Sequence, residues 1–424
     1  RLLFIFSFLS LLVVDGKAQE VETLTLEDCL RIGIDNNLSL EGKRKEIQKS
    51  KYGVSENRSK LLPQITVIAG YNNNFDPPVS VTDGSSYGVP YNITKTLQHT
   101  ANAGLEMQMP LFNQTLYTSM SIAKVMEEIS RLSYGKARED IIMQISKMYY
   151  LGQVTAEQIV LIKANITRLE ELRDITQAFF DNGMSMEVDL KRVNINLENL
   201  KVQYDNAQAM MKQQLNMLKY IMDYPAEKEF VLTPVNTDSI TTVALTGLSE
   251  NIYELQLSQS QVQLAEKQKK IISNGYIPSL SLTGSWRYAA YTDKGYHWFH
   301  SGPSNHWFRS YGLGLTLRIP IFDGLDKTYK IKKAMIDIEN SKLAWENARK
   351  SLQTQYLNAV NDLMNNQRNF KKQKDNYLLA EDVYAVTSDR YREGIASMTE
   401  VLQDEMQTVS YTHLRAHETS LHLV

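Results

Sequence analysis

Two stretches of the chain alternate apolar and polar residues with a period of two, and each stretch follows a proline. After Pro278 the apolar positions include Leu280, Leu282 and Trp286, and serine, threonine or arginine occupies the positions between them. The stretch after Pro63 alternates in a similar way. Successive side chains of a strand point to opposite faces of a sheet, so both stretches predict amphipathic β-strands.

Each of these stretches is followed, after a loop, by a second alternating stretch, so four strands are expected. We predict them at about 64–74, 98–109, 279–289 and 309–320. A helix from about Thr25 to Leu62 is predicted before the first strand, because the sequence TLED at its start suits a capping box.

Very long helices are predicted after the second and fourth strands. Proline, which breaks helix interiors, is absent between Pro110 and Pro225 and after Pro320. In the first of these segments, mostly apolar side chains recur at alternating steps of four and three residues, which is the 3.5-residue repeat of a coiled coil. The nine positions, seven of them apolar, are Ile141, Ile145, Met148, Gly152, Thr155, Ile159, Ile162, Ile166 and Leu169.

The same order of landmarks occurs twice in the chain. Pro63 and Pro278 are 215 residues apart, Pro110 and Pro320 are 210 apart, and Gly183 and Gly394 are 211 apart. An offset that stays within a few residues for three landmarks in the same order indicates an internal duplication.

We therefore predict a first structural repeat over 19–223 and a second over 246–409. Each comprises a helix, two strands and a long helical hairpin, and the hairpins are expected to turn at Gly183 and Gly394, since glycine suits the left-handed residue that ends a helix. Residues 224–245 are expected to form a small equatorial element beside the coiled coil.

The two ends of the chain read differently from its middle. Residues 1–18 contain a short apolar run followed by small residues, which is typical of a signal peptide, here incomplete at its N-terminus. Residues 410–424 break the heptad-like pattern and resemble translated sequencing-adaptor read-through, so we interpret them as a non-native tail.

Composition narrows the classes of function. The net charge is −2, so bulk charge does not indicate a nucleic-acid partner, and the single cysteine excludes an intrachain disulfide. No nucleophile–base pair or phosphate-binding glycine loop is found, so we predict no enzyme and no cofactor. The spacing of His297, His300 and His306 could suit metal ligands, but no acid or cysteine joins them, so no metal site is predicted.

Four strands from one chain are too few to close a barrel in a membrane. An open sheet edge in lipid leaves unpaired N–H and C=O groups, each costing several kcal/mol. If the apolar face meets lipid, several chains must therefore share one barrel. The alternative is a half-buried sheet in a soluble protein, because such a sheet shows the same alternation of apolar and polar residues. The residues expected to face lipid are Leu280, Leu282, Trp286, Leu313, Leu315 and Leu317.

Over residues 24–409 the chain resembles the TolC family of outer-membrane efflux proteins. The resemblance rests on the proline-led strands, on MPLF and IPIFDG at the ends of the return strands, and on YREGIASMTEVL at a helix turn. It implies a mainly α-helical fold with a membrane β-barrel. Three identical protomers, each a duplicated strand–helix hairpin, share a 12-stranded barrel that continues into a helical tunnel in the periplasm.

The resemblance also implies sites. The hairpin turns would form a periplasmic tip that touches an adaptor protein, which assigns adaptor contact to Asn182, Gly183, Met184, Glu393, Gly394, Ile395 and Ala396. Glu400 takes the place of an acid that rings the closed tunnel mouth, and Tyr391 matches a tyrosine that ties it shut. Gln403 stands where a second acid occurs in the family, and Asp189 corresponds to Glu400 in the first repeat. Solvated helix-surface residues are the alternative interpretation of these four gate positions.

The function implied is the outer-membrane exit duct of a tripartite efflux or type I secretion system. Its partners would be further copies of itself, a periplasmic adaptor, an inner-membrane pump and outer-membrane lipid, with no nucleic acid. The alternative is a secreted or periplasmic coiled-coil scaffold or adaptor without channel activity. The cargo, whether drugs, metal ions or a secreted protein, and the identity of the pump do not follow from the sequence.

Overall fold

The computed structural model describes residues 22–95, 97–234, 249, 251–292 and 306–408. The predicted signal peptide, most of the histidine-rich loop, the second half of the 224–245 element and the predicted tail lie outside these residues. The chain divides into two compact units, which are described separately: unit 1 within 1–41, 137–248 and 354–424, and unit 2 within 42–136 and 249–353.

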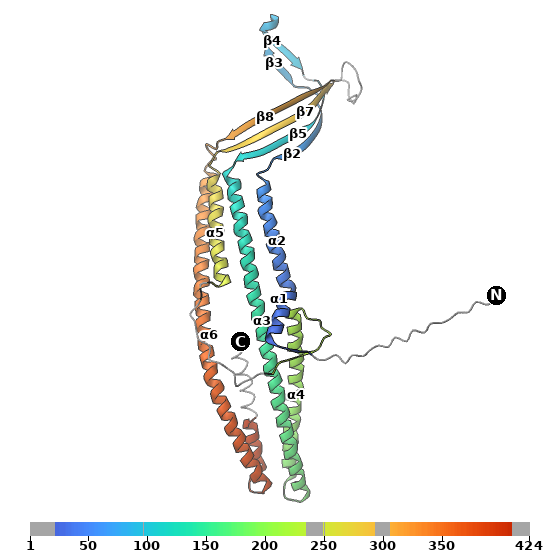
Figure 1. The fold of residues 1–424 in the computed structure, drawn as a ribbon, viewed down its shortest axis with the longest axis vertical. Coiled ribbons are helices and arrows are strands. Elements are labelled where there is room, and N and C mark those ends of the chain that lie inside the picture. Colours follow the sequence, from blue (N-terminus) through green and yellow to red (C-terminus); the bar gives the residue numbers. More distant parts are fainter. Residues whose placement is uncertain (1–21, 96, 235–248, 250, 293–305, 409–424) are drawn as a thin grey trace, which may run out of the picture. The chain divides into compact units, whose positions relative to one another are not determined.

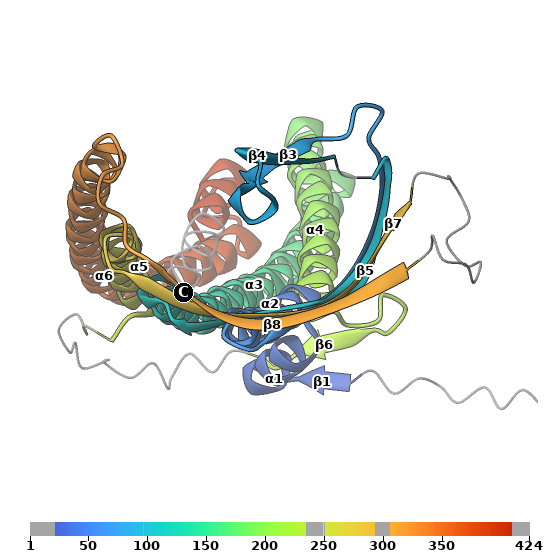
Figure 2. The same cartoon turned by 90° about the horizontal axis from the view of Figure 1, so that it is seen from above.

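Unit 2 contains an antiparallel four-stranded sheet built from both repeats. Its strands are β2 (Gln64–Asn73), β5 (His99–Phe112), β7 (Ser279–Thr292) and β8 (His306–Arg318), in the order β2-β5-β7-β8 (Figure 1). These ranges lie close to the four predicted strands. The repeats meet where β5 pairs with β7, which leaves β2 and β8 as the two edges. Seen from above, the strands follow one curve (Figure 2).

The register separates two chemically different faces of the sheet. Leu282 pairs with Leu315 and Leu280 with Leu317, whereas Ser281 pairs with Thr316. Since residues alternate between faces, one face carries leucine and aromatic side chains and the other carries serine, threonine and charged side chains.

The loop between β2 and β5 contains a β-ribbon that the sequence interpretation missed. It consists of β3 (Val79–Asp83) and β4 (Tyr91–Lys95), paired antiparallel, with a one-turn 3-10 helix, η1 (Ser85–Tyr87), between them. The alternation of valine with serine and threonine in β3 was the available signal.

Four helical segments complete unit 2: α2 (Leu38–Ser59), the start of α3 (Gln114–Asp181), α5 (Tyr253–Asn274) and the start of α6 (Asp326–Arg392). Polar contacts join neighbouring segments. The hydroxyl oxygens of Ser50 in α2 and Ser130 in α3 lie 2.7 Å apart. Lys136 of α3 forms an ion pair with Glu254 of α5, with 3.1 Å between Nζ and Oε2.

The predicted first helix, Thr25 to Leu62, is wrong in one respect, because it is two helices. α1 (Leu26–Asn36) ends at Asn37, which has a non-helical ψ of 118°, and α2 begins at Leu38. The Asn37 side chain stabilises the break: its Oδ1 accepts from the backbone N–H groups of Ser39 and Leu40, and its Nδ2 donates to the carbonyl of Ile221.

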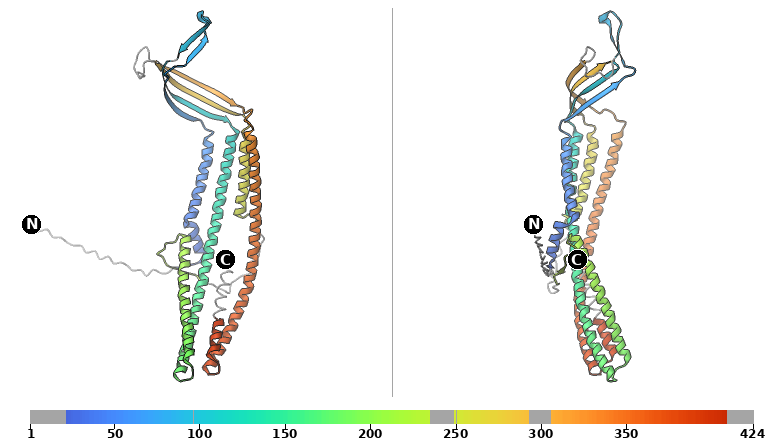
Figure 3. Two further views of the ribbon diagram at one scale, coloured as in Figure 1. Left: turned by 180° about the vertical axis from the view of Figure 1, so that it is seen from behind. Right: turned by 90° about the vertical axis from the view of Figure 1, so that its right-hand side faces the viewer.

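Unit 1 contains two helical hairpins and a small element beside them. The first hairpin joins the end of α3 to α4 (Glu187–Met222), and the second joins the end of α6 to a helix over 398–408 (Figures 1 and 3). Both hairpins share one apolar core, formed by Leu169, Leu172, Val193, Leu197, Leu200, Tyr384, Tyr391, Met398, Val401 and Leu402.

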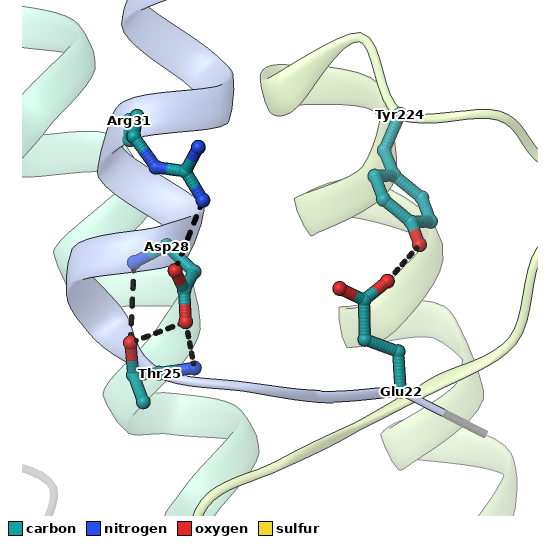
Figure 4. Close-up of polar contacts among 5 residues, drawn as sticks. All are labelled: Glu22, Thr25, Asp28, Arg31 and Tyr224. Atoms are coloured by element: carbon teal, nitrogen blue, oxygen red, sulfur yellow. Dashed lines mark hydrogen bonds and ion pairs between the residues drawn. The ribbon is translucent and has the colours of Figure 1, made fainter. Parts of the chain in front are cut away.

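The small element is a parallel pair of strands, β1 (Glu22–Leu24) with β6 (Phe230–Leu232). Thr25 caps α1: its hydroxyl accepts from the backbone of Asp28, whose carboxylate accepts from the Thr25 backbone, and Tyr224 donates to Glu22 (Figure 4). The Thr25 hydroxyl, then the Thr25 backbone N–H and Arg31, donate to the Asp28 carboxylate and hold its pKa below the usual value. Of the helices in the described ranges, none combines the length and the hydropathy that a membrane-crossing helix requires.

Candidate functional site

The two hairpin tips have the same backbone geometry. Gly183 and Gly394 adopt left-handed φ angles of 74° and 77°. At the first tip the N–H of Met184 donates to Phe179 and that of Gly183 to Phe180; the second tip repeats these bonds from Ile395 and Gly394. Both tips are Schellman motifs, which explains glycine at these positions, because a side chain is strained at such φ angles.

The helices that leave the tips begin differently. The helix over 398–408 starts with a capping box, because Ser397 Oγ accepts from the Glu400 N–H at 3.3 Å and Glu400 Oε2 accepts from the Ser397 N–H at 3.0 Å. In the first repeat, α4 has Met186 at its N-cap and no side-chain cap. Asp189, the counterpart of Glu400, instead pairs with Arg192 at 3.3 Å.

The structure places the four predicted gate residues in different environments. Tyr391 is buried, and its hydroxyl lies 3.4 Å from Thr176 Oγ1 while its ring packs 5.5 Å from that of Phe179. Tyr391 therefore ties the end of α6 to α3. Glu400 and Gln403 are exposed, and Asp189 is half-buried.

Six of the seven residues predicted to contact an adaptor are exposed at the tips. The exposed residues are Asn182, Gly183, Met184, Glu393, Gly394 and Ile395. Ala396 differs, because it is half-buried and packs against the shared core of the two hairpins. Apolar side chains at both tips, above all Met184 and Ile395, thus point away from that core.

The apolar face of the sheet is open over β8 and partly covered over β7. Leu313, Leu315 and Leu317 of β8 are exposed, as is Trp286 of β7, whereas Leu280 and Leu282 are half-buried. All six predicted lipid-facing residues share this face, together with Ile65, Val67, Leu105 and Tyr311.

The opposite face carries charge and a shallow hollow of about 500 Å³. Arg287 of β7 forms an ion pair with Glu106 of β5, which links the two repeats across the centre of the sheet. Gln64, Thr66, Thr283 and Ser285 line the same hollow. The sheet therefore has one face suited to an apolar medium and one suited to water.

A polar cluster in unit 1, buried at Asn165, Tyr384 and Glu405 and half-buried at Arg168 and Glu381, was missed by the sequence interpretation. It joins Asn165 and Arg168 of α3, Glu381 and Tyr384 of α6, and Glu405. The available sequence signal was the spacing of Met398, Val401, Glu405 and Thr408 at steps of three and four, which puts Glu405 on one helix face with these residues. All four are buried in the structure.

Within the described ranges, no group of three or more His, Cys, Asp and Glu side chains is arranged to hold a metal ion. His297 and His300 lie outside these ranges, and only the backbone of His306, at the start of β8, is described.

Comparison with known proteins bears on both the fold and the family. The family model "Outer membrane efflux protein" matches residues 32–222 and 236–410. A curated relative, the outer membrane protein TolC of Vibrio cholerae, is 21% identical over 316 residues. That alignment covers 73% of this chain and spans 66% of the length of the relative.

Solved structures of outer-membrane channels share the fold. The outer-membrane channel OprN gives a TM-score of 0.77 at 14% identity, covering 94% of this chain and 87% of that one. The structure of CusC gives 0.77 at 15% identity, covering 94% and 90%. The predicted fold class, a TolC-like protomer with long helical hairpins and four strands, is confirmed by these likenesses. The chain is a protein of the outer membrane and belongs to the outer membrane efflux protein family.

Proposed function

We propose that the protein is the outer-membrane exit duct of a tripartite efflux or secretion system. In this proposal three copies share a 12-stranded barrel, and their helical hairpins form a periplasmic tunnel that receives cargo from an adaptor and an inner-membrane pump. The observation that carries the proposal is the four-stranded sheet, which has one exposed apolar face and two edge strands, β2 and β8, whose outer sides pair with no other strand in the described part of the chain.

The edges require partners if the apolar face lies in lipid. Unpaired N–H and C=O groups on β2 and β8 have no water to bond to inside a bilayer, so only a closed sheet is stable there. Pairing β8 of one copy with β2 of the next removes both edges. Three copies supply twelve strands, an even number as in bacterial barrels, and membership of the family supports three.

The helices of unit 1 also expose apolar stripes. On α4, Val193, Leu197 and Leu200 are buried in the core, whereas another row remains exposed at steps of seven or eight residues. That row is Val188, Ile195, Val202, Met210 and Met217. On α6, Leu357, Met364 and Leu378 are exposed at multiples of seven. Apolar residues at heptad spacing are typical of the contact seam between helices of a coiled coil. We therefore propose that these exposed rows pack against helices of neighbouring copies of the chain.

The tips carry the proposed gate and the adaptor contact. Exposed apolar side chains at both turns offer a docking surface, and Tyr391 would hold the second hairpin in the closed position through Thr176 and Phe179. Glu400, exposed one turn beyond the tip, would line the narrow end of the tunnel. An adaptor that binds the open arrangement better than the closed one would shift the equilibrium toward opening.

The test is the state of the protein extracted from outer membranes. We expect native mass spectrometry in detergent to give a trimer, and detergent removal to cause aggregation because the sheet face becomes exposed to water. A folded monomer that stays monodisperse without detergent would contradict the proposal. It would favour the alternative of a soluble scaffold with a half-buried sheet.

A further inference from the structure

One carboxylate in unit 1 is buried with an unsatisfied oxygen. Only 3% of Glu405 is exposed, and its Oε1 atom has no hydrogen-bond partner among the described residues. The neighbouring positions of its seam are Val401 and Thr408, both buried. Placing a charge in such a setting is costly unless it is paired and hydrogen-bonded.

The cation that acts on Glu405 is already engaged elsewhere. Arg168 of α3 donates to Asn165, and its Nη1 lies 3.8 Å from Glu381 Oε1. Its guanidinium carbon lies 5.5 Å from the centroid of the Tyr384 ring. Among the described residues, the buried Arg168 Nε and Asn165 Nδ2 atoms have no hydrogen-bond partner, so the cluster is not fully satisfied there.

The remaining groups around Glu405 do not add positive charge. α4 contributes apolar side chains to this core, namely Val193, Leu197 and Leu200. Among the described residues, Arg168 is the charged group that acts on the Glu405 carboxylate. Of the other titratable groups, Glu381 contacts Arg168, Glu171 acts on Tyr384, and Tyr391 belongs to the same core. Asp404 precedes Glu405 in the chain. One arginine, Arg168, therefore interacts with two acids, Glu381 and Glu405.

We propose that Glu405 is a proton-binding site: when protonated, it holds the helix over 398–408 against α3 and α6, and when ionised, it loosens this packing. The protonated side chain removes the buried charge and supplies an O–H donor to the cluster. The ionised side chain requires water or a hydrogen bond from Arg168, whose Nη1 and Nη2 groups are shared with Glu381 and Asn165 and whose Nε group has no partner among the described residues.

The direction of the pH effect follows from comparing the pKa of Glu405 in the packed helix with its pKa in the loosened helix. Burial raises the pKa of Glu405 from 4.5 to about 7, and Arg168 opposes only part of this rise. In a loosened, hydrated helix the pKa returns toward its usual value. The packed arrangement is therefore most stable in acid, and its stability falls as the pH rises from about 4.5 through about 7.

The hairpin that Glu405 stabilises also carries Tyr391 and Glu400. The consequence for transport rests on the proposed channel function: acid would favour the closed tip, and neutral pH would make it easier to open. The proton site itself rests on the geometry of the cluster, so it is tested without measuring transport.

Hydrogen–deuterium exchange of the 398–408 amides tests the site in the detergent-extracted protein. After correction for intrinsic exchange, we expect the opening equilibrium to rise roughly ten- to thirtyfold between about pH 5.5 and about pH 8, given a pKa of about 7 in the packed state. An opening equilibrium that does not change over this range would overturn the proposal, whether or not the protein conducts.

Three variants separate the proton site from a general pH effect. Glu405→Gln keeps the shape and removes the charge, so these amides should be protected equally at both pH values. Asp404→Asn, on the same helix but half-exposed, should keep the wild-type dependence. Arg168→Met should move the midpoint to higher pH, because the cation that lowers the pKa of Glu405 is lost. Wild-type pH dependence in Glu405→Gln, or a downward shift in Arg168→Met, would contradict the assignment.

Discussion

Replacing Leu315 by arginine is expected to abolish assembly in the membrane, whereas Thr316→Arg, one residue along the same strand, is tolerated. Leu315 is 67% exposed and lies on the apolar face opposite Leu282. Thr316 lies on the polar face opposite Ser281. The two substitutions introduce the same charge at nearly the same depth, and they differ only in the face of the sheet.

The expected difference is large because lipid cannot solvate the guanidinium group. An arginine on the lipid face of a barrel costs about 2–4 kcal/mol near the midplane and less near the interfaces. Three copies would each carry this cost in the proposed trimer. On the polar face, an added arginine lies opposite Ser281 and, in the proposed barrel, meets water in the lumen.

The measurement is the amount of heat-modifiable trimer recovered from outer-membrane fractions. We expect Leu315→Arg to reduce the trimer severely and Thr316→Arg to leave most of it. Leu282→Arg, on the same face of the neighbouring strand, should behave like Leu315→Arg. Equal recovery of the two β8 variants would mean that the apolar face does not meet lipid.

Replacing Glu400 by glutamine is expected to change the ion selectivity of the channel without disturbing the tip. Glu400 Oε2 accepts a hydrogen bond from the Ser397 N–H, and the amide oxygen of glutamine can accept the same bond. The variant therefore keeps the capping box and removes one negative charge per protomer. In the proposed trimer, this removes three charges from one narrow ring.

The effect is expected to be strongest for multivalent cations. At contact distances in water, each pair of unit charges contributes about 1 kcal/mol. Loss of the ring should therefore weaken block by a trivalent cation by at least about tenfold and reduce the preference for cations. Single-channel conductance in a planar bilayer measures both quantities.

Gln403→Glu is the reciprocal variant, because Gln403 is exposed one turn after Glu400 on the same helix. It should strengthen the block and the cation preference. If Glu400→Gln leaves selectivity and block unchanged, the Glu400 carboxylates face away from the pore axis. Their role is then limited to capping the helix over 398–408.

The sequence predicted those parts of the fold that repeat with a simple period. Alternation after Pro278, and less regularly after Pro63, located the strands to within a few residues. Landmark offsets that agree to within five residues indicated the duplication. The coiled-coil seam was also largely predicted, since Ile141, Ile145, Ile162 and Leu169 are buried. Tyr149, rather than the predicted Met148, is buried in this seam, because the 3.6-residue helix period drifts away from a strict heptad.

Apart from the local β3–β4 ribbon, the features that were missed depend on contacts between residues distant in the chain. The break at Asn37 is stabilised by the carbonyl of Ile221, which no local pattern reveals. Glu405 reads as a solvated residue unless its position in the Val401 and Thr408 seam is recognised. The pairing of β5 with β7 joins the two repeats, and periodicity within one strand does not specify which strands become neighbours.

Disulfide trapping between β2 and β8 tests most directly whether separate copies close one barrel. Within one protomer these strands are separated by β5 and β7, so they lie roughly 14 Å apart at about 4.8 Å per strand. A disulfide requires Cα atoms no more than about 7 Å apart, so any bond between the two edges must join different copies. The native Cys29 is buried and the pKa of its thiol is raised to about 12, so it does not compete and can be replaced by serine.

In this background, Thr66→Cys on β2 is combined in turn with a cysteine at Ser310, Gly312 or Gly314 of β8, all on the polar face of the sheet. The matched control moves the first cysteine to Gln108 of β5, which is paired on both sides and is not an edge. After oxidation in membranes, we expect at least one of the three pairs to give covalent dimers and trimers on a non-reducing gel, and the Gln108 control to remain monomeric. Monomers for all three edge pairs, or equal cross-linking by the Gln108 control, would contradict closure of a shared barrel through β2 and β8.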